Sequence, residues 1–382
     1  MDFLLTMEQE EIKHFAKEIS KNEIAPYAQK YDEEEKFPIE LIEKLREVGF
    51  VNLAIPEEYG GPGIDKISHA LIIEEIANGC ASVATSIEAN SLASYPILIA
   101  GSETLKKKYL QKLTKEGKFA AFALTEPGAG SDVQSIKSTA KKYGSEYILN
   151  GEKCFITNAS VADFYVVLAK TFDESGDKKY TAFIVDRDSE GVTIGNKEKK
   201  LGLRASDTAS VIFNDVQVTA ENRIGKEGDG LKIFMKGLMH ARPMVGAQAV
   251  GIAQAAFEAA LQYSKERAQF GKPISNHQAI QFMLADMAMN IEAARLLVHK
   301  SASLLQAGKP SIKHSSFAKC FAADTAMKVV TDAVQIFGGY GFIREYPVEK
   351  YFRDAKIMQI YEGTNQIQRI VISREVLSEN VK

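Results

Sequence analysis

The middle of the chain holds a series of strand-like segments with no helix-length pattern between them. Between about residues 119 and 225, short runs of β-branched and aromatic residues alternate with turns rich in Gly, Asp and Lys, among them residues 164–168, 181–185 and 210–213. Parallel strands need long crossover connections, which are usually helices. This region is therefore expected to form an antiparallel sheet and not a Rossmann-type sheet.

One dipeptide in this region predicts a tight turn. Asn150-Gly151 lies between the apolar segments 147–149 and 154–156. Both central positions of the commonest two-residue hairpin turn need a positive φ, which Asn and Gly adopt most easily. We therefore expect a β-hairpin whose turn is formed by Asn150 and Gly151.

Apolar residues recur at helical spacing on both sides of the predicted sheet. Thr6 and Gln9 form a capping box, and the helix that follows is expected to stop at Pro26. A second helix is expected to begin at Pro38 and to end at Gly49. Further helical patterns cover about residues 69–78, 81–100, 103–115, 245–268, 278–306, 315–337 and 366–377.

This order of patterns predicts an α+β fold in three domains. We expect an N-terminal helical domain over residues 1–117, a middle antiparallel β-sheet domain over residues 118–226 and a C-terminal four-helix bundle over residues 227–382.

The charge and residue counts exclude several classes of function. Lys and Arg number 47 against 50 Asp and Glu, so the chain has no basic footprint for nucleic acid. Uninterrupted apolar runs are far shorter than the roughly 18–20 residues of a membrane span. With no signal or transit pattern at the N-terminus, we expect a cytoplasmic protein without a span. The 3 cysteines and 6 histidines lack the spacing of metal ligands, so we expect no metal site. A reaction that side chains alone cannot carry out would then need an organic cofactor.

Two motifs in the predicted sheet suit a ligand, and each also has an ordinary structural explanation. Residues 125–132 follow an apolar strand, and their small side chains let backbone amides approach a ligand. A Gly-Pro loop of the same composition is the alternative. Phe155 and Thr157 are two apart on a strand, so together they can stack on and hydrogen-bond to a planar ring. Phe155 is equally suited to the core.

Motifs in the C-terminal half are similarly open to two interpretations. Three glycines within residues 338–341 exceed what a helix C-cap needs, so a close backbone or phosphate is an alternative to a simple turn. Arg267 and Phe270 lie near a predicted helix end, and residues in such a position are normally exposed to solvent. Glu362, placed before a glycine near a helix start, is suited to act as a base or to favour the helix dipole.

Taken together, these stretches resemble the acyl-CoA dehydrogenase family in order and spacing over essentially the whole chain. The chain is most similar to the medium-chain type, with short-chain members as near relatives, through residues 85–92, Arg242-Pro243 and residues 360–364. The resemblance implies a helical domain, a β domain and a four-helix bundle, with FAD between the last two. It also implies a homotetramer built as a dimer of dimers, because a neighbouring subunit completes each FAD site.

The resemblance assigns cofactor contacts residue by residue. Phe155 and Thr157 would flank the isoalloxazine ring, although many relatives have Trp at the position of Phe155. The other residues fall into three groups: Phe122, Leu124, Thr125, Gly130 and Ser131 for flavin and pyrophosphate; Arg267, Phe270, Gln278, Gln335 and Gly339 reaching across the dimer interface; and Thr364 and Gln366 for the adenosine part.

Glu362 matches the catalytic base of the family. Burial against a ligand is expected to raise its pKa towards working pH by desolvating the charged form. Some relatives carry the base at the position of Ala241, so here Glu362 stands alone. The substrate side is assigned to Ser131, Arg242, Tyr361 and Gly363, with Thr85 and Glu88 at the floor of the acyl cavity. Met239 departs from the Asp that relatives commonly carry near the pantetheine arm.

The implied activity is FAD-dependent α,β-dehydrogenation of short- or medium-chain acyl-CoA to trans-2-enoyl-CoA, as in fatty acid β-oxidation. Electrons would pass to an electron-transferring flavoprotein. The alternatives are an enoyl-CoA reductase, an acyl-CoA oxidase, a dehydrogenase for a branched or unusual acyl-CoA, or a non-enzymatic flavin- or CoA-binding protein; retention of Glu362 argues against the last.

Overall fold

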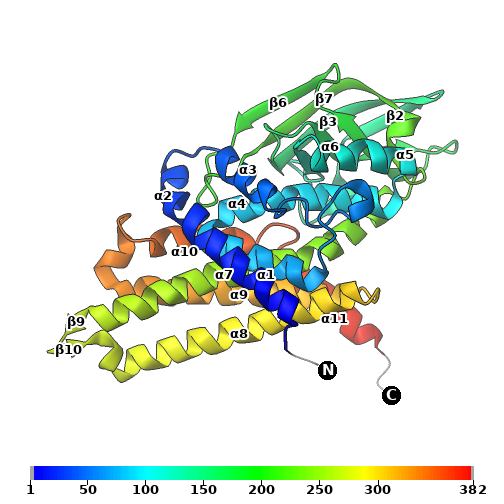
Figure 1. Ribbon diagram of the computed structural model, residues 1–382. Coiled ribbons are helices and arrows are strands. Elements are labelled where there is room, and N and C mark those ends of the chain that lie inside the picture. The colour runs from blue at the N-terminus through cyan, green and yellow to red at the C-terminus, as the bar shows by residue number, and fades with distance from the viewer. Residues whose placement is uncertain (1–3, 380–382) are drawn as a thin grey trace.

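The computed structural model describes residues 4–379. Figure 1 shows an N-terminal group of helices, a β-sheet and a set of long C-terminal helices, with the sheet and α8 on opposite sides of α4. The helices before the sheet are α1 (Met7–Ile19), α2 (Ala25–Glu33), α3 (Ile39–Glu47), α4 (Lys66–Ala100), α5 (Glu103–Leu105) and α6 (Gln111–Thr114).

The first helix does not stop at Pro26 as expected. The capping box of Thr6 and Gln9 is present, but α1 continues through a π-helical turn at Ser20–Ile24 directly into α2. Pro26 lies in the first turn of α2, where a proline lacks no needed hydrogen bond. The proline therefore begins a new helical segment instead of ending the old one.

Helix α4 unites the two helical patterns predicted at residues 69–78 and 81–100. The backbone at Cys80 is non-helical, with φ −159° and ψ 108°, so the helix is kinked there. Most of its residues are buried, because it runs through the centre of the molecule.

The sheet is mixed and not purely antiparallel. Its strands are β1 (Ala120–Ala123), β2 (Thr139–Tyr143), β3 (Glu146–Thr157), β4 (Phe164–Phe172), β5 (Lys178–Asp186), β6 (Val192–Lys197), β7 (Thr208–Thr219) and β8 (Arg223–Ile224). They follow the order β6-β7-β3-β2-β4-β5-β8, with β1 on β4. The pairs β1–β4 and β2–β4 are parallel, and the chain that connects each pair runs through β3, and for β1–β4 also through β2, in place of an α-helix. The other pairs are antiparallel.

The predicted hairpin at Asn150-Gly151 is wrong. Strand β3 runs straight through both residues, and the register with β7 shifts there, which is a β-bulge. Asn150 and Asp215 exchange two hydrogen bonds across the strands, of 2.8 and 2.9 Å. A Cβ on Gly151 would lie 2.2 Å from the Ser138 hydroxyl. The dipeptide therefore serves a bulge and a close approach, and the chain reverses at Gly144-Ser145 instead.

The C-terminal part consists of α7 (Gly230–Glu266), a short hairpin of β9 (Ala268–Gln269) and β10 (Lys272–Pro273), α8 (Gln278–Gln306), α9 (Ile312–Phe337), α10 (Val348–Met358) and α11 (Asn365–Ser378). Helix α7 begins 15 residues before the predicted helix and passes through Pro243. Helix α10 was not predicted, because two of its buried positions are charged. Lys350 and Asp354 pair with each other at 2.5 Å inside the protein.

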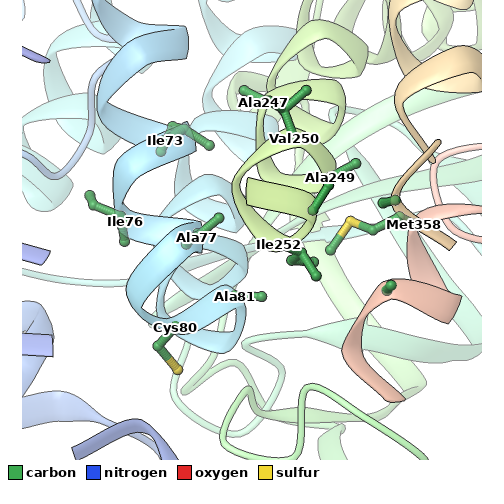
Figure 2. Close-up of a cluster of buried hydrophobic side chains, with 14 of the residues drawn as sticks. Ile73, Ile76, Ala77, Cys80, Ala81, Ala247, Ala249, Val250, Ile252 and Met358 are labelled. Atoms are coloured by element: carbon green, nitrogen blue, oxygen red, sulfur yellow. The ribbon is translucent and has the colours of Figure 1, made fainter. Parts of the chain in front are cut away.

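The main core lies between α4, α7 and the helices around them. Figure 2 shows Ile73 and Ile76 of α4 and Val250 and Ile252 of α7 among its buried side chains. The two helices approach so closely at Gly251 that a Cβ there would lie 2.2 Å from the Glu74 carbonyl oxygen. This packing holds α4 and α7, which both carry predicted site residues, in fixed relation.

Two helices among residues 4–379, α4 and α7, are long and apolar enough to cross a membrane by length and composition alone. Polar residues interrupt the apolar sequence of both helices, so neither forms an uninterrupted apolar run. Their most apolar windows are 94% and 72% buried inside the protein, so the core accounts for their apolar surface.

Candidate active site

The segment between α10 and α11 carries Glu362 in a constrained backbone conformation. Glu362 has φ +52° and Gly363 has φ +93°, and both angles lie in the left-handed region. The Gly363 carbonyl accepts hydrogen bonds of 2.9 Å from Lys319 Nζ and from Gln368 Nε2. Gln368 also donates to the Glu362 carbonyl at 3.3 Å. Buried side chains on two helices thus fix the position of Glu362.

The carboxyl group of Glu362 faces the interior without a partner. Its Oε2 is buried and has no hydrogen bond among the described residues. Burial raises the pKa of Glu362 to about 8, and the Glu88 carboxylate adds to the rise, while Arg242 and Lys319 oppose it. This direction agrees with the sequence-based expectation.

Arg242, which the resemblance assigns to the substrate side, lies beside this segment. It is 5% exposed, and burial lowers its pKa. Its Nη1 donates to the Ser316 hydroxyl at 3.3 Å, while its buried Nε has no partner among residues 4–379. An ideal Cβ on Gly363 would lie 3.9 Å from Arg242 Nη2. A polar ligand group between Arg242 and Glu362 would satisfy the free hydrogen-bonding atoms of both.

Gln248 of α7 joins two of the predicted substrate residues. Thr85 Oγ1 donates to Gln248 Oε1 at 2.7 Å, and the Tyr361 hydroxyl donates to the same oxygen at 3.2 Å. Burial raises the pKa of Tyr361, so it acts as a neutral donor. Sequence reasoning missed Gln248, although one buried amide in an apolar helix is a usable signal.

Glu88 lies in a buried polar cluster on α4. Its Oε1 contacts His69 Nε2 at 2.8 Å and accepts a hydrogen bond of 3.1 Å from Ser91. Tyr95 nearby is buried, its hydroxyl has no partner in the described chain, and burial raises its pKa. The ring of His240 lies against Tyr95 at 5.3 Å. His69 was not predicted from the sequence.

The predicted loop over residues 125–132 is held by a buried ion pair. Lys153 Nζ lies 2.7 Å from Glu126 Oε1 and donates to the Leu124 carbonyl at 3.1 Å. Both charged residues are buried. Gly130 and Ser131 are exposed, and a Cβ on Gly130 would meet nothing within 4 Å. Sequence reasoning missed this pair, since the two residues are far apart in the chain.

The other predicted flavin residues occupy nearby strands. Thr125 is half-buried after β1, and its carbonyl accepts a hydrogen bond of 2.9 Å from the Cys154 amide. The ring of Phe122 packs on Phe234, with centroids 4.4 Å apart. Phe155 is 65% exposed at φ +55°, and Thr157 is half-buried at the end of β3. Phe155 therefore presents its ring outside the core, which settles the alternative left open by its sequence.

A second group of predicted residues lies at the far end of α7. Arg267 follows Arg242 by 25 positions, so the rise of a helix places it about 37 Å away. Its guanidinium lies over the Tyr340 ring, 5.5 Å from the centroid. Phe270 is 94% exposed in the β9–β10 turn, which projects from the end of the bundle (Figure 1). The remaining members of this group, all exposed, are Gln278, Gln335 and Gly339.

Thr364 and Gln366 lie together at the start of α11. Thr364 caps that helix by accepting from the Ile367 amide at 3.3 Å. Both residues line a pocket of about 390 Å³ together with Asp324 and Arg369. The residues assigned to the cofactor thus occur in separate places on one chain.

The residues present fit a bound flavin nucleotide. Open space surrounds the Cβ positions of Gly128, Gly130 and Gly339, so a phosphate can approach the backbone there. The Phe155 ring is exposed for stacking on a planar group.

Comparison with known proteins agrees with this geometry. The N-terminal, middle and C-terminal domains of acyl-CoA dehydrogenases match residues 6–117, 121–216 and 228–377. A probable acyl-CoA dehydrogenase, FadE25 of Mycobacterium tuberculosis, is 47% identical over 98% of this chain and 97% of its own length.

Two solved structures share the fold. Butyryl-CoA dehydrogenase from Megasphaera elsdenii is 45% identical with a TM-score of 0.95, covering 99% of this chain and 100% of that one. A chain from a study of the electron-transferring flavoprotein of Acidaminococcus fermentans is 48% identical with a TM-score of 0.95, with the same coverage of 99% and 100%. The three matched domains, in order along the chain, and these similarities show that the protein belongs to the acyl-CoA dehydrogenase family.

Proposed function

We propose that this acyl-CoA dehydrogenase oxidises short- or medium-chain acyl-CoA thioesters to trans-2-enoyl-CoA, with Glu362 as the base that removes the α-proton. FAD is the cofactor of the family, and when bound it supplies the acceptor for the hydride that leaves the β-carbon. The butyryl-CoA named for the Megasphaera elsdenii structure supports a short acyl chain.

The state of the Glu362 carboxyl group carries this proposal. An ordinary exposed glutamate is a weak base at neutral pH, because its pKa is near 4.3. Burial brings the pKa of Glu362 to about 8. Its ionised carboxylate is therefore a stronger base than that of an exposed glutamate. Its buried, unpartnered Oε2 is the atom that would accept the α-proton.

The backbone next to this carboxyl group is suited to polarise the thioester carbonyl. The amide of Glu362 donates no hydrogen bond among the described residues, and its carbonyl is held by Gln368. Donation from this amide to the carbonyl oxygen would stabilise the charge that develops as the α-proton leaves, by an amount that is typically about 3 kcal/mol for one such donor. The Tyr361 hydroxyl donates to Gln248 Oε1, which also accepts from Thr85, so the side chain of Tyr361 is held in place next to this amide.

The proposed assembly is a homotetramer, and the spacing of the residues assigned to the cofactor supports it. Arg267, at the C-cap of α7, lies about 37 Å along the helix from Arg242, and Phe270 lies beyond it in the β9–β10 turn. This is too far for either residue to serve the same cofactor as Glu362 within one chain. Both residues would reach the FAD of a neighbouring subunit in a dimer of dimers. The cytoplasmic location expected from the sequence stays a prediction.

The proposed electron acceptor is an electron-transferring flavoprotein. Support comes from the similar chain described with the flavoprotein of Acidaminococcus fermentans. An acyl-CoA oxidase would pass electrons to oxygen, and an enoyl-CoA reductase would run the reaction in reverse.

A substrate series tests the proposal. The FAD-loaded protein is mixed anaerobically with butyryl-, hexanoyl-, octanoyl- and isobutyryl-CoA, while flavin bleaching is followed and the product is identified by mass spectrometry. We expect the fastest bleaching with a straight chain of four to eight carbons and a trans-2-enoyl-CoA product. Fast reoxidation by air would instead indicate an oxidase, and bleaching by the branched substrate alone would contradict the proposed substrate class.

A further inference from the structure

Lys319 of α9 differs from the other buried lysines of the described chain. Lys153 and Lys350 each pair with a carboxylate, at 2.7 and 2.5 Å. Lys319 has no exposed surface, and its Nζ donates only to neutral oxygens, the Gly363 carbonyl and Asn365 Oδ1, both at 2.9 Å. Burying an ammonium without a carboxylate partner is costly. Packing alone gives no reason to keep a charge at this position.

The same segment already has a neutral donor. Gln368 Nε2 donates to the Gly363 carbonyl at 2.9 Å and to the Glu362 carbonyl at 3.3 Å. Hydrogen bonding to this segment therefore does not require a cation. What distinguishes Lys319 from Gln368 is its positive charge close to Glu362.

Charged and titratable groups face Glu362 from every helix packed around it. Burial and the Glu88 carboxylate raise its pKa, whereas Arg242 and Lys319 lower it. Lys319 is itself affected, because burial lowers its pKa to about 8 and Glu362 opposes that shift. Among residues 4–379, the groups that interact electrostatically with Glu362 are Glu88 and Tyr95 of α4, Arg242 of α7, Lys319 of α9 and the adjacent Tyr361. Lys319 also interacts with Cys320 and Asp324 of its own helix.

We propose that Lys319 is a positioning residue that anchors the Glu362-Gly363 segment to α9 and, through its charge, sets the pH range in which Glu362 can accept a proton. The inference rests on the proposed role of Glu362 as the base. Without the Lys319 charge, Glu362 remains protonated to higher pH, because a nearby opposite charge favours the ionised carboxylate.

Three variants separate charge from anchoring. Lys319→Met removes both, Lys319→Arg keeps the charge, and Gln368→Leu removes only neutral donors. Lys350→Met is the matched control, since it deletes a buried lysine of the α10 pair with Asp354. If Lys319→Met does not fold, Lys319→Gln keeps a donor for the Gly363 carbonyl without the charge and takes its place.

The protonation of Glu362 is read by infrared difference spectroscopy of the FAD-loaded, substrate-free protein, with Glu362→Gln used to identify its carboxyl band. We expect Lys319→Met to raise the midpoint of this titration by about one pH unit. Lys319→Arg, Gln368→Leu and Lys350→Met should stay within about 0.3 unit of wild type. An unchanged midpoint in Lys319→Met, or an equal shift in Gln368→Leu, would overturn the proposal.

Flavin bleaching by butyryl-CoA gives a second readout. The pH at which the bleaching rate is half-maximal should also rise by about one unit in Lys319→Met, because the rate is proportional to the fraction of Glu362 that is ionised. A Glu362→Gln protein that still bleaches would refute the proposed base while leaving the infrared test of Lys319 interpretable. The two failures are therefore distinguishable.

Discussion

Replacing Glu362 by Gln should stabilise the protein more and more as the pH rises from about 4.5 to 8. Folding raises the pKa of Glu362 from 4.5 to about 8, chiefly by burial. A group with a raised pKa contributes its full stability below the unfolded-state pKa and loses it as the pH rises through the folded-state pKa. The glutamine variant has no proton to release, so it does not share this loss.

The size of the effect follows from the pKa difference. Each unit of difference is worth about 1.4 kcal/mol. At pH 7 the carboxyl group is mostly protonated in the folded chain and ionised in the unfolded chain, so wild type loses about 3 kcal/mol relative to its value near pH 4. The free energy of unfolding of Glu362→Gln should therefore gain about 3 kcal/mol on that of wild type between pH 4.5 and 7.

Urea unfolding of the FAD-loaded protein, followed by circular dichroism at equal subunit concentration, measures this difference at each pH. Glu152→Gln, which removes an exposed carboxylate from β3, is the control and should run parallel to wild type. A difference between Glu362→Gln and wild type that stays constant from pH 4.5 to 8 would refute the argument that burial perturbs the base.

Three further variants test other parts of the structure. Lys153→Met leaves the buried Glu126 carboxylate without its 2.7 Å partner and should cost about 3 kcal/mol in urea unfolding and weaken FAD retention; a loss below about 1 kcal/mol would show the pair to be dispensable. Arg267→Glu should release FAD and loosen the oligomer together in sedimentation, and a fully flavinylated wild-type monomer would contradict the shared site. Gly251→Ala pushes a Cβ against the Glu74 carbonyl at 2.2 Å, so thermal unfolding should occur several degrees lower, and an unchanged melting temperature would disprove tight α4–α7 packing.

The order helix, sheet, helix was predictable because periodicity extends over many residues and averages out local exceptions. Local rules failed where tertiary contacts override them. Asn150-Gly151 has the preferred residues of a hairpin turn, yet cross-strand bonds to Asp215 and the nearby Ser138 hold it in a bulge. The two-residue turn with positive φ at both positions occurs instead at Phe270-Gly271, which turn preferences disfavour because Phe has a Cβ.

The candidate site was predictable where short motifs carry it and not where it depends on long-range pairs. Glu362 and Arg242 were assigned because the short motifs around them resemble those of the family. Lys319, Gln248 and His69 were not, because each contacts a residue that is far away in the sequence. A single buried polar residue on an apolar helix face is the sequence signal common to all three, but without the fold it does not reveal its partner.

The most direct test of the account is single-turnover flavin bleaching by butyryl-CoA in Glu362→Gln under anaerobic conditions. The variant keeps the shape of the side chain but cannot accept a proton, so it should still bind FAD while bleaching slows by about 10²–10⁴-fold. Glu88→Gln, which alters the neighbouring carboxylate, shows whether any loss of charge in the pocket has the same effect, and it should retain far more of the rate. Bleaching of Glu362→Gln within a few-fold of wild type would contradict the assignment of Glu362 as the base.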